Sequence, residues 1–278
     1  MQIIADSGSS KTDWRLILVD GSIQQHRGVG FNPTYQSSEE MIKLLKDDFL
    51  LNIGQDVEII HYYGAGCSSE GMKSQVEASL KTIFDHAEIF IEHDLLAAAR
   101  ATCGREPGIA CILGTGSNSC DYDGIEIIHS TPAPGYVLGD EGGGTYIGKK
   151  FLQDFIHQEM PVDIYKRVKE ELSLDYNEII DRVYKQPFAG RYMASFCRFI
   201  SKYKSDPYCY LLFYNAFQDF FKKYIFKYPD WQIKQVNFVG SIAFYNSDIL
   251  RNAAAEAGIH VNLILESPIA GLTLYHKQ

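Results

Sequence analysis

Residues 1–30 read MQIIADSGSSKTDWRLILVDGSIQQHRGVG and contain three β-prone segments, at residues 2–5, 13–19 and 22–30. Two polar turns separate them, the first within residues 7–12 and the second at Asp20-Gly21. Asp-Gly between apolar runs is a strong hairpin signal, and short apolar runs bounded by turn residues are typical of strands. The stretch therefore predicts three consecutive strands joined by tight turns.

Helices and further strands alternate after this unit. Residues 37–51 have apolar side chains at helical spacing, with Ser37 or Ser38 as the N-cap. A strand at 57–63, a helix at 68–84 and a strand at 87–91 follow. The order of the first hundred residues is therefore βββαβαβ.

The same layout begins again near residue 109. Two strands, at 109–113 and 119–122, flank the turn Gly114-Thr115-Gly116-Ser117-Asn118, and Asp123-Gly124 leads to a third strand at 126–130. The later elements are helices at 143–157, 162–172, 175–185, 189–203 and 208–227, a strand at 234–239, a helix at 247–257, a strand at 261–265 and a helix at 268–276.

This restart predicts a two-lobed α/β fold with a duplicated core of mixed sheets and a cleft between the lobes. We expect one lobe to comprise residues 1–107 and 266–278, and the other residues 108–265. The helical part of the second lobe is rich in Tyr and Phe, which are more often core than interface. A homodimer built on that aromatic surface is the alternative.

The composition of the chain argues against some classes of partner. Of the 278 residues, 26 are Lys or Arg and 35 are Asp or Glu, which gives a net charge of −9 with no separate basic block. This argues against a partner that is a nucleic acid. The N-terminus does not read as a secretory signal and no apolar run approaches the length of a membrane span, so we expect a cytoplasmic protein without membrane contact.

Six cysteines occur without a C-x-x-C pair. Buried free thiols in a cytoplasmic protein are the simpler interpretation of these residues. Ligation of a cluster by Cys103, Cys111 and Cys120 is the sharper alternative.

Two turns have the chemistry of phosphate binding. Small residues in the turn that begins at Asp6 and ends at Thr12 let backbone N–H groups approach an anion, and Asp6 itself could hold a magnesium ion. The Gly114–Asn118 turn has the same chemistry at the equivalent point of the second unit. Either turn alone could be an ordinary polar hairpin. Together they favour a phosphate-bearing ligand.

Acidic residues follow two other strands. Asp94 lies where a strand becomes a helix, either as an N-cap or as a general base, and we expect its neighbour His93 to be a core histidine. The loop Gly139-Asp140-Glu141-Gly142-Gly143-Gly144 offers two carboxylates among glycines, suited to sugar hydroxyls or simply to the start of a helix.

Several common motifs are missing or incomplete. The chain lacks a Walker sequence and an H-E-x-x-H motif. Gly64-Ala65-Gly66-Cys67-Ser68-Ser69 is only an incomplete dinucleotide fingerprint, so we do not expect NAD binding.

The ordered set of four motifs resembles the BadF/BadG/BcrA/BcrD family of the actin/sugar kinase/heat-shock-protein-70 superfamily, and within it the N-acetylglucosamine kinases. The resemblance covers the whole chain and implies a duplicated ribonuclease-H-like fold that binds ATP and Mg²⁺. It implies that Asp6 organises the metal and that Asp94 is the base that accepts the proton of the attacking sugar hydroxyl. ATP phosphates would be held by Gly8, Ser9, Ser10, Lys11, Thr12, Gly114, Thr115, Gly116 and Ser117.

The same resemblance places the sugar and the nucleoside. Asn32, Asn118 and Asp140 would bind the sugar, and Gly66 and Cys67 would form the pocket for its acetamido group. Gly240 and Ser241 would form the turn beside adenosine. The expected reaction is phosphorylation of an amino sugar, N-acetylglucosamine at its 6-hydroxyl. N-acetylmuramic acid, glucosamine or another hexose derivative is left open as the substrate.

Two other functions compete with this one. The same family includes ATPase activators of 2-hydroxyacyl-CoA dehydratases and benzoyl-CoA reductases, which share an iron–sulfur cluster between two subunits. The chain could also be a non-catalytic sensor of sugar or nucleotide. In that case Asp94 would only cap its helix.

Overall fold

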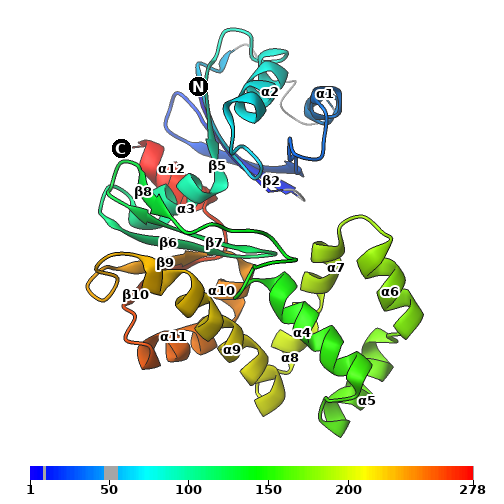
Figure 1. The fold of residues 1–278 in the computed structure, drawn as a ribbon. Helices are drawn as coiled ribbons and strands as arrows, with labels where there is room; N and C mark the ends of the chain where they lie inside the picture. Colours follow the sequence, from blue (N-terminus) through cyan, green and yellow to red (C-terminus); the bar gives the residue numbers. More distant parts are fainter. Residues whose placement is uncertain (9–10, 47–55, 278) are drawn as a thin grey trace. The chain divides into compact units, whose positions relative to one another are not determined.

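The computed structural model describes residues 1–8, 11–46 and 56–277 (Figure 1). These residues separate into two compact units, residues 1–104 with 268–278 and residues 105–267. The sequence placed the two divisions at 107/108 and 265/266. Each unit is built on its own five-stranded sheet.

The sheet of the first unit has the strand order β3-β2-β1-β4-β5. Strands β1, β2 and β3 are antiparallel neighbours, whereas β4 and β5 continue the sheet parallel to β1. The bounds are Gln2–Ser7 (β1), Lys11–Ile17 (β2), Ile23–Val29 (β3), Ile59–Gly64 (β4) and Glu88–His93 (β5). The three strands predicted from residues 1–30 are therefore present, and the predicted turn at Asp20-Gly21 joins β2 to β3. Strands β1 and β2 extend into the first predicted turn, because Ser7, Lys11 and Thr12 are strand residues.

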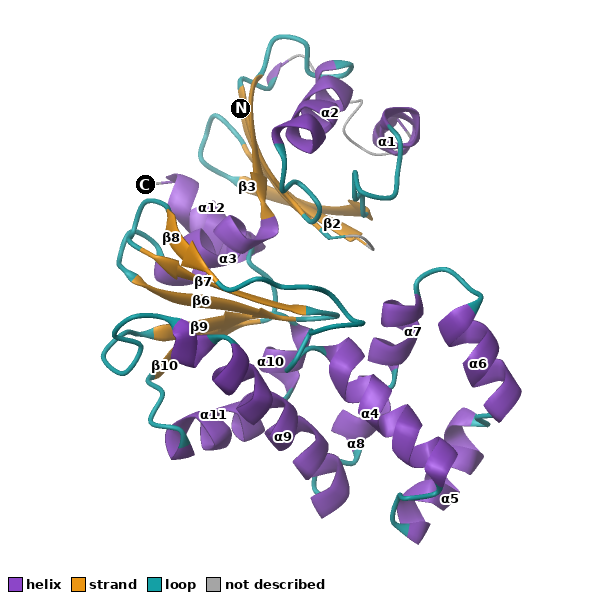
Figure 2. Cartoon of the chain, in the orientation of Figure 1, coloured by secondary structure: helices purple, strands orange, loops and turns teal. Residues whose placement is uncertain are grey.

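Two pairs of helices belong to this sheet (Figure 2). They are α1 (Ser38–Lys46) with α2 (Glu70–Lys81), and α3 (Asp94–Cys103) with α12 (Ile269–Lys277). Met41 of α1 and Leu80 of α2 pack with Ile60 and Tyr62 of β4 in one buried cluster. Ser37 caps α1, because its hydroxyl accepts the Glu40 N–H at 3.3 Å and Glu40 returns a bond to the Ser37 N–H. Residues 47–51 of the predicted helix lie outside the described residues.

The sheet of the second unit repeats this arrangement. Its order is β10-β9-β6-β7-β8, in which β6, β9 and β10 are parallel and β7 and β8 are antiparallel. The bounds are Gly108–Leu113 (β6), Ser117–Tyr122 (β7), Ile127–Ser130 (β8), Val236–Val239 (β9) and Val261–Leu265 (β10). Taken in chain order, the five strands occupy the same places in both sheets. The duplicated layout inferred from the sequence is therefore confirmed.

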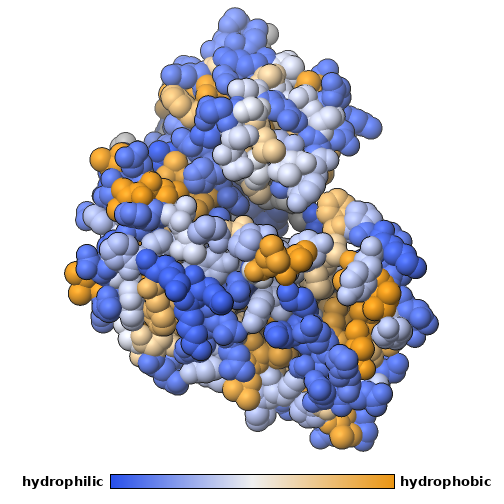
Figure 3. Space-filling view, viewed as in Figure 1, coloured by the Kyte–Doolittle hydropathy of each residue, from blue (hydrophilic) through white to orange (hydrophobic). Residues whose placement is uncertain are grey.

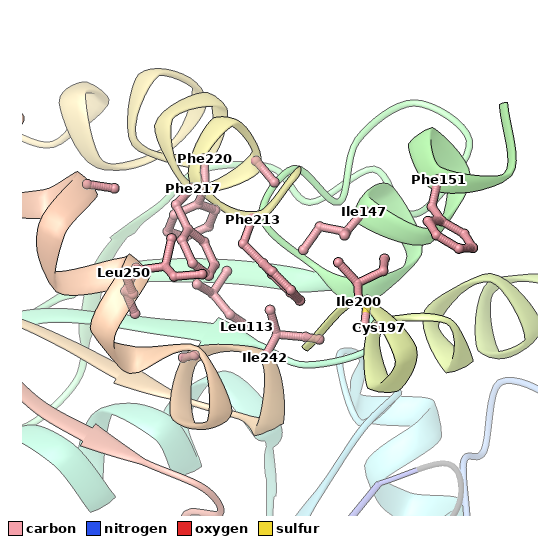
Figure 4. Packing of buried hydrophobic residues seen from close by; sticks show 14 of the residues in the cluster. Leu113, Ile147, Phe151, Cys197, Ile200, Phe213, Phe217, Phe220, Ile242 and Leu250 are labelled. Atoms are coloured by element: carbon pink, nitrogen blue, oxygen red, sulfur yellow. The ribbon is translucent and has the colours of Figure 1, made fainter. Parts of the chain in front are cut away.

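Helices make up most of the second unit. They are α4 (Gly144–His157), α5 (Val162–Leu172), α6 (Tyr176–Tyr184), α7 (Ala189–Ser195), α8 (Cys197–Lys202), α9 (Pro207–Lys223), the 3₁₀ turn η3 (Ile225–Lys227), α10 (Ser241–Tyr245) and α11 (Ser247–Glu256). Phe213, Phe217 and Phe220 of α9 are buried with Leu113 of β6 and Leu250 of α11 (Figure 4). Many of the aromatic residues of this region thus form core, as expected.

The helix predicted over 189–203 is two helices, α7 and α8, which are interrupted at Phe196 although its backbone stays in the right-handed helical region. No Gly or Pro marks this break. Its cause is tertiary: a Cβ on Gly148 of α4 would lie 1.9 Å from the Met193 carbonyl oxygen, and the Cys197 thiol donates to the Gly144 carbonyl at 3.4 Å. The close approach of α4 therefore fixes where α7 ends.

The six cysteines form no disulfide among the described residues, and all except Cys103 are buried. Among the helices that the structure describes, none is long and apolar enough to cross a membrane. On the face drawn in Figure 3, polar residues predominate and apolar residues gather in small separate patches.

Candidate active site

Three functional segments of the first unit lie at one edge of its sheet. Asp6 lies opposite Tyr63 of β4, and Gly64 lies opposite His93 of β5. Because β1, β4 and β5 are parallel, Asp6, the loop Gly64–Cys67 and Asp94 share the carboxyl-terminal edge. Ligands of open α/β sheets bind at this edge.

Asp94 is the first residue of α3 and is not its cap. The preceding residue, His93, is the N-cap, and its Nδ1 accepts the Leu96 N–H at 3.2 Å. His93 is half-buried and is not the core histidine that the sequence suggested. The N-cap of α3 is therefore His93 and not Asp94, although the Asp94 carboxyl still interacts with the N–H groups of Leu95 and Asp94.

Burial raises the pKa of the Asp94 carboxyl to about 6, against the opposing effect of the Leu95 and Asp94 N–H groups. At neutral pH the group is mostly ionised yet close to its titration point. This suits a carboxylate that takes up a proton during a reaction.

Three residues assigned to the sugar come together beside Asp94. Gly66 has φ +84°, and a Cβ there would lie 2.1 Å from Oδ1 of Asn32, so only glycine fits. Cys67 is fully buried; burial first, and then the Asp94 charge, raise the pKa of its thiol to about 12. Asn32, Gly66, Cys67 and Asp94 therefore form one neighbourhood within the first unit.

Thr34 belongs to this neighbourhood but was missed from the sequence. Its N–H donates to Asn32 Oδ1 at 2.9 Å, and its hydroxyl would lie 2.8 Å from a Cβ on Gly66. The Asn-Pro-Thr turn was the available signal, because Asn side chains commonly accept from the N–H two residues on.

The first phosphate turn is braced by its own side chains. The Gly8 N–H donates to the Lys11 carbonyl at 2.9 Å. The Thr12 hydroxyl is buried, donates to the Val29 carbonyl at 3.0 Å and lies 2.8 Å from the Ser7 hydroxyl. The Lys11 ammonium pairs with Asp13 at 3.0 Å. Ser9 and Ser10, also assigned to phosphate, lie outside the described residues.

The second phosphate turn joins the acidic glycine loop in the other unit. The N–H groups of Gly144 and Thr145 donate to the carbonyls of Gly114 and Thr115, each at 2.8 Å. A Cβ on Gly143 would lie 2.6 Å from the carbonyl carbon of Gly116, so the two loops are in backbone contact. The Gly114–Asn118 turn and the Gly139–Gly144 loop are separate in the sequence but in direct contact in the fold.

Asp140 sits at this junction. It is only 8% exposed and has φ +62°, and its Oδ1 accepts the Ser117 N–H at 3.2 Å. Burial raises the pKa of its carboxyl. Ser117 and Asn118 are the first residues of β7, so the strand begins two residues earlier than predicted. The Asn118 amide oxygen accepts the Ser119 N–H at 2.9 Å.

The residues assigned to adenosine lie beside this turn. Gly240 follows β9, which is the parallel neighbour of β6, and its φ is +121°. A Cβ there would lie 2.4 Å from the Leu113 carbonyl oxygen. Ser241 begins the short helix α10, which the sequence did not predict.

Several known proteins are similar to this chain in sequence or fold, although no protein-family model matches it. A candidate N-acetylglucosamine kinase of Porphyromonas gingivalis, known from its crystal structure, is 36% identical with a TM-score of 0.94, and the match covers 99% of this chain and 98% of that one.

Two more distant proteins have related descriptions. The N-acetylmuramic acid/N-acetylglucosamine kinase of Clostridium acetobutylicum is 23% identical over 208 residues, which are 70% of this chain and 68% of that protein. A candidate N-acetylglucosamine kinase of Chromobacterium violaceum, 18% identical, has the same fold with a TM-score of 0.75, over 99% of this chain and 98% of its own. The chain belongs to the N-acetylglucosamine kinase family, whose members have a two-lobed, actin-like ribonuclease-H fold, and it is an ATP-dependent carbohydrate kinase.

Proposed function

We propose that this kinase transfers the γ-phosphate of ATP to the 6-hydroxyl of N-acetylglucosamine. The observation that carries the proposal is the placement of Asp94 beside Asn32, Gly66 and Cys67 in one unit. Its carboxylate is not used as a helix cap, and the adjoining loop is shaped by a glycine that no other residue can replace. The names of the relatives from Porphyromonas and Clostridium support the same sugar class. We also place the chain in the BadF/BadG/BcrA/BcrD group.

Asp94 acts as the general base in this proposal. Phosphoryl transfer depends mainly on positioning and charge stabilisation, and a carboxylate that accepts the hydroxyl proton orients the nucleophile. A base with a pKa of about 6 is ionised at neutral pH but still basic enough to take the proton. Asn32, Asn118 and Asp140 would hold sugar hydroxyls, while Gly66 and Cys67 would face the acetamido group.

The glycine turns would hold the nucleotide phosphates. A Cβ on Gly114 would meet no described atom within 4 Å, so packing within the protein does not account for this glycine. A phosphate that approaches the backbone does account for it. The remaining groups are Gly8, Ser9, Ser10, Lys11, Thr12, Thr115, Gly116 and Ser117 for phosphate, and Gly240 and Ser241 for adenosine.

Asp6 is our candidate for holding Mg²⁺. Mg²⁺ in kinases is usually held by one or two carboxylates, substrate phosphates and waters, so a single aspartate fits it. In the described part of the chain, no group of three or more His, Cys, Asp or Glu side chains is arranged to hold a metal, which leaves a lone carboxylate as the expected mode. When bound, the ion would neutralise phosphate charge.

The alternative function, an ATPase activator that shares an iron–sulfur cluster between two subunits, has less support. A cluster shared between two subunits needs cysteines that reach the surface, whereas Cys111 and Cys120 are fully buried within β6 and β7. N-acetylmuramic acid is the second candidate substrate, because it appears in the name of the Clostridium relative. We also propose a cytoplasmic location and leave a homodimer to sedimentation analysis.

The test is ATP turnover across a set of sugars. ADP release would be followed with N-acetylglucosamine, N-acetylmuramic acid, glucosamine and glucose, and the phosphorylated position read by NMR. We expect N-acetylglucosamine to give the highest kcat/KM and a product phosphorylated at its 6-oxygen. Absence of sugar-stimulated ADP release with every hexosamine would contradict the proposal.

A further inference from the structure

A second pocket lies in the first unit, near the carboxyl-terminal ends of β4 and β5, where Tyr63 and Glu92 line it. It lies among β4, β5, α3 and α12 and has a volume of about 200 Å³. Its principal lining residues are His61, Tyr63, Phe90, Arg100, Tyr275 and His276. None of them has a part in the catalytic arrangement proposed above.

Arg100 is the charged centre of this pocket. Its Nη1 donates to the Tyr63 hydroxyl at 2.9 Å, and its guanidinium lies 5.3 Å from the centre of the Tyr275 ring. Its Nε is buried and has no hydrogen-bond partner within the described chain. No described carboxylate lies within 4 Å of the guanidinium. A buried donor without a partner is costly. Because Arg100 also lines the pocket, its guanidinium would stabilise an acceptor that enters there.

The acid in the pocket wall acts on Arg100 through its charge but forms no direct salt bridge with it. Glu92 faces the pocket, but its carboxylate pairs with the Lys73 ammonium at 3.2 Å. The His61 ring is neutral at physiological pH. Burial, and to a lesser extent the Arg100 charge, lowers the pKa of this ring to about 4. The guanidinium is therefore surrounded by neutral rings and one carboxylate that is already paired.

The walls of the pocket are flat and aromatic. The His61 ring stacks on His276 at 3.7 Å between centroids and on Phe90 at 5.1 Å. His276 also lies 2.7 Å from the Tyr63 hydroxyl, so the two residues and Arg100 form one hydrogen-bonded chain. Such a chain fixes the guanidinium in place. A preorganised cation with an aromatic wall suits a small anion attached to an organic group.

We propose that this Arg100 pocket binds a phosphate group, either as inorganic phosphate or as the phosphate of a small monoester. A guanidinium presents several N–H donors in a planar fork that matches tetrahedral oxyanions, and among the described residues only one of those donors is bonded, to Tyr63. The volume fits a phosphate with a few further atoms, since it falls below the about 300–1,000 Å³ typical of drug-sized ligands.

The pocket shares its elements with the catalytic segments. Arg100 follows Asp94 by six residues in α3, which is roughly 9 Å along the helix axis. Tyr63 directly precedes Gly64, the first residue of the loop that contains Gly66 and Cys67. The second site would thus lie next to the proposed sugar pocket, on elements that the two sites share.

The test is direct binding, which does not depend on the proposed kinase reaction. Inorganic phosphate and N-acetylglucosamine 6-phosphate would be titrated separately into the wild-type chain, with the ring signals of His61 and His276 followed by NMR and assigned with H61Q and H276Q. We expect both signals to shift in a saturable way. A tenfold tighter response to the monoester would identify an organic phosphate as the ligand, and equal responses would identify the phosphate group alone.

Variants then assign the binding to Arg100. Arg100→Gln should weaken the response at least tenfold and Arg100→Lys should weaken it less, whereas the exposed Arg198→Gln, which also removes one positive charge, should bind like wild type. Unshifted His61 and His276 signals in the wild type would overturn the proposal even if Arg100→Gln failed to fold. Equal binding by a folded Arg100→Gln would also overturn it.

Discussion

The backbone N–H of Ser117 donates to Oδ1 of Asp140 at 3.2 Å, which joins the glycine turn after β6 to the acidic loop before α4. The bond crosses 23 residues of sequence. It holds a buried carboxylate in a left-handed backbone conformation that few residues tolerate. Asp140 is therefore positioned by the same turn that we assign to phosphate.

Asp140→Asn should remove the negative charge of this side chain while leaving the side chain in the same position. The amide keeps an oxygen for the Ser117 N–H and Asn tolerates positive φ, so the melting temperature should stay close to that of wild type. The KM for the sugar should rise about tenfold or more, because a hydrogen bond to a charged group contributes about 1.5–3 kcal/mol. Steady-state kinetics and calorimetry check both parts, with Glu141→Gln as the neighbouring control. An unchanged KM for Asp140→Asn would remove Asp140 from the sugar site.

Asp140→Ala should instead lower stability. It leaves the buried Ser117 N–H without an acceptor, which costs about 1–3 kcal/mol. Denaturant unfolding measures this difference. A variant as stable as wild type would mean that the bond does not hold the two loops together.

Replacement by alanine at two glycines of the second unit should have opposite effects on stability and on the KM for ATP. Gly240→Ala should lose at least about 2 kcal/mol of unfolding free energy, because its Cβ would lie 2.4 Å from the Leu113 carbonyl at φ +121°. Gly114→Ala meets no described atom, so it should fold normally while the KM for ATP rises. Unfolding curves and nucleotide kinetics on both variants decide this. A destabilised Gly114→Ala with unaltered KM would reverse the assignment.

Much of this account could be predicted from the sequence because the signals are local. Asp20-Gly21 and Asp123-Gly124 mark hairpins by their own backbone preferences, and apolar periodicity marks the strands and most helices. The order of motifs along the chain then indicates the duplication. These signals need only neighbouring residues.

Other features depend on contacts between distant residues and could not be predicted. The break at Phe196 is set by α4, which begins some fifty residues earlier. The Ser117–Asp140 bond and the place of Thr34 beside Gly66 also need the folded chain. The role of His93 is also hard to predict, because a histidine ring here replaces the more common Ser, Thr, Asp or Asn as a helix cap.

Asp6→Asn should alter the requirement for metal and nothing else. The amide is a weaker ligand for Mg²⁺, so the magnesium concentration for half-maximal activity should rise about tenfold or more. The KM for the sugar should not change. The exposed Asp85→Asn is the matched control in the same unit. An identical magnesium dependence in Asp6→Asn and wild type would exclude Asp6 as the metal ligand.

Asp94→Asn should be more stable than wild type above pH 6. The pKa of Asp94 is raised from 3.8 to about 6 by burial, so the folded state favours the protonated form. The stability penalty is absent below about pH 4, grows as the carboxyl ionises and is complete above about pH 6, at about 3 kcal/mol. Unfolding at pH 4 and pH 8 tests this. A variant less stable than wild type at pH 8 would show that the carboxylate is held by favourable contacts instead.

The central claim is that Asp94 is the general base of a sugar kinase, and the turnover of Asp94→Asn tests it most directly. We measure N-acetylglucosamine-dependent ADP formation by wild type and Asp94→Asn from pH 5 to pH 9, with nucleotide binding as the check on folding. The account predicts a loss of about 10²–10⁴-fold in kcat with nucleotide binding retained, and a wild-type rate that falls below about pH 6 with the uptake of one proton. A folded Asp94→Asn that turns over at nearly the wild-type rate would contradict it.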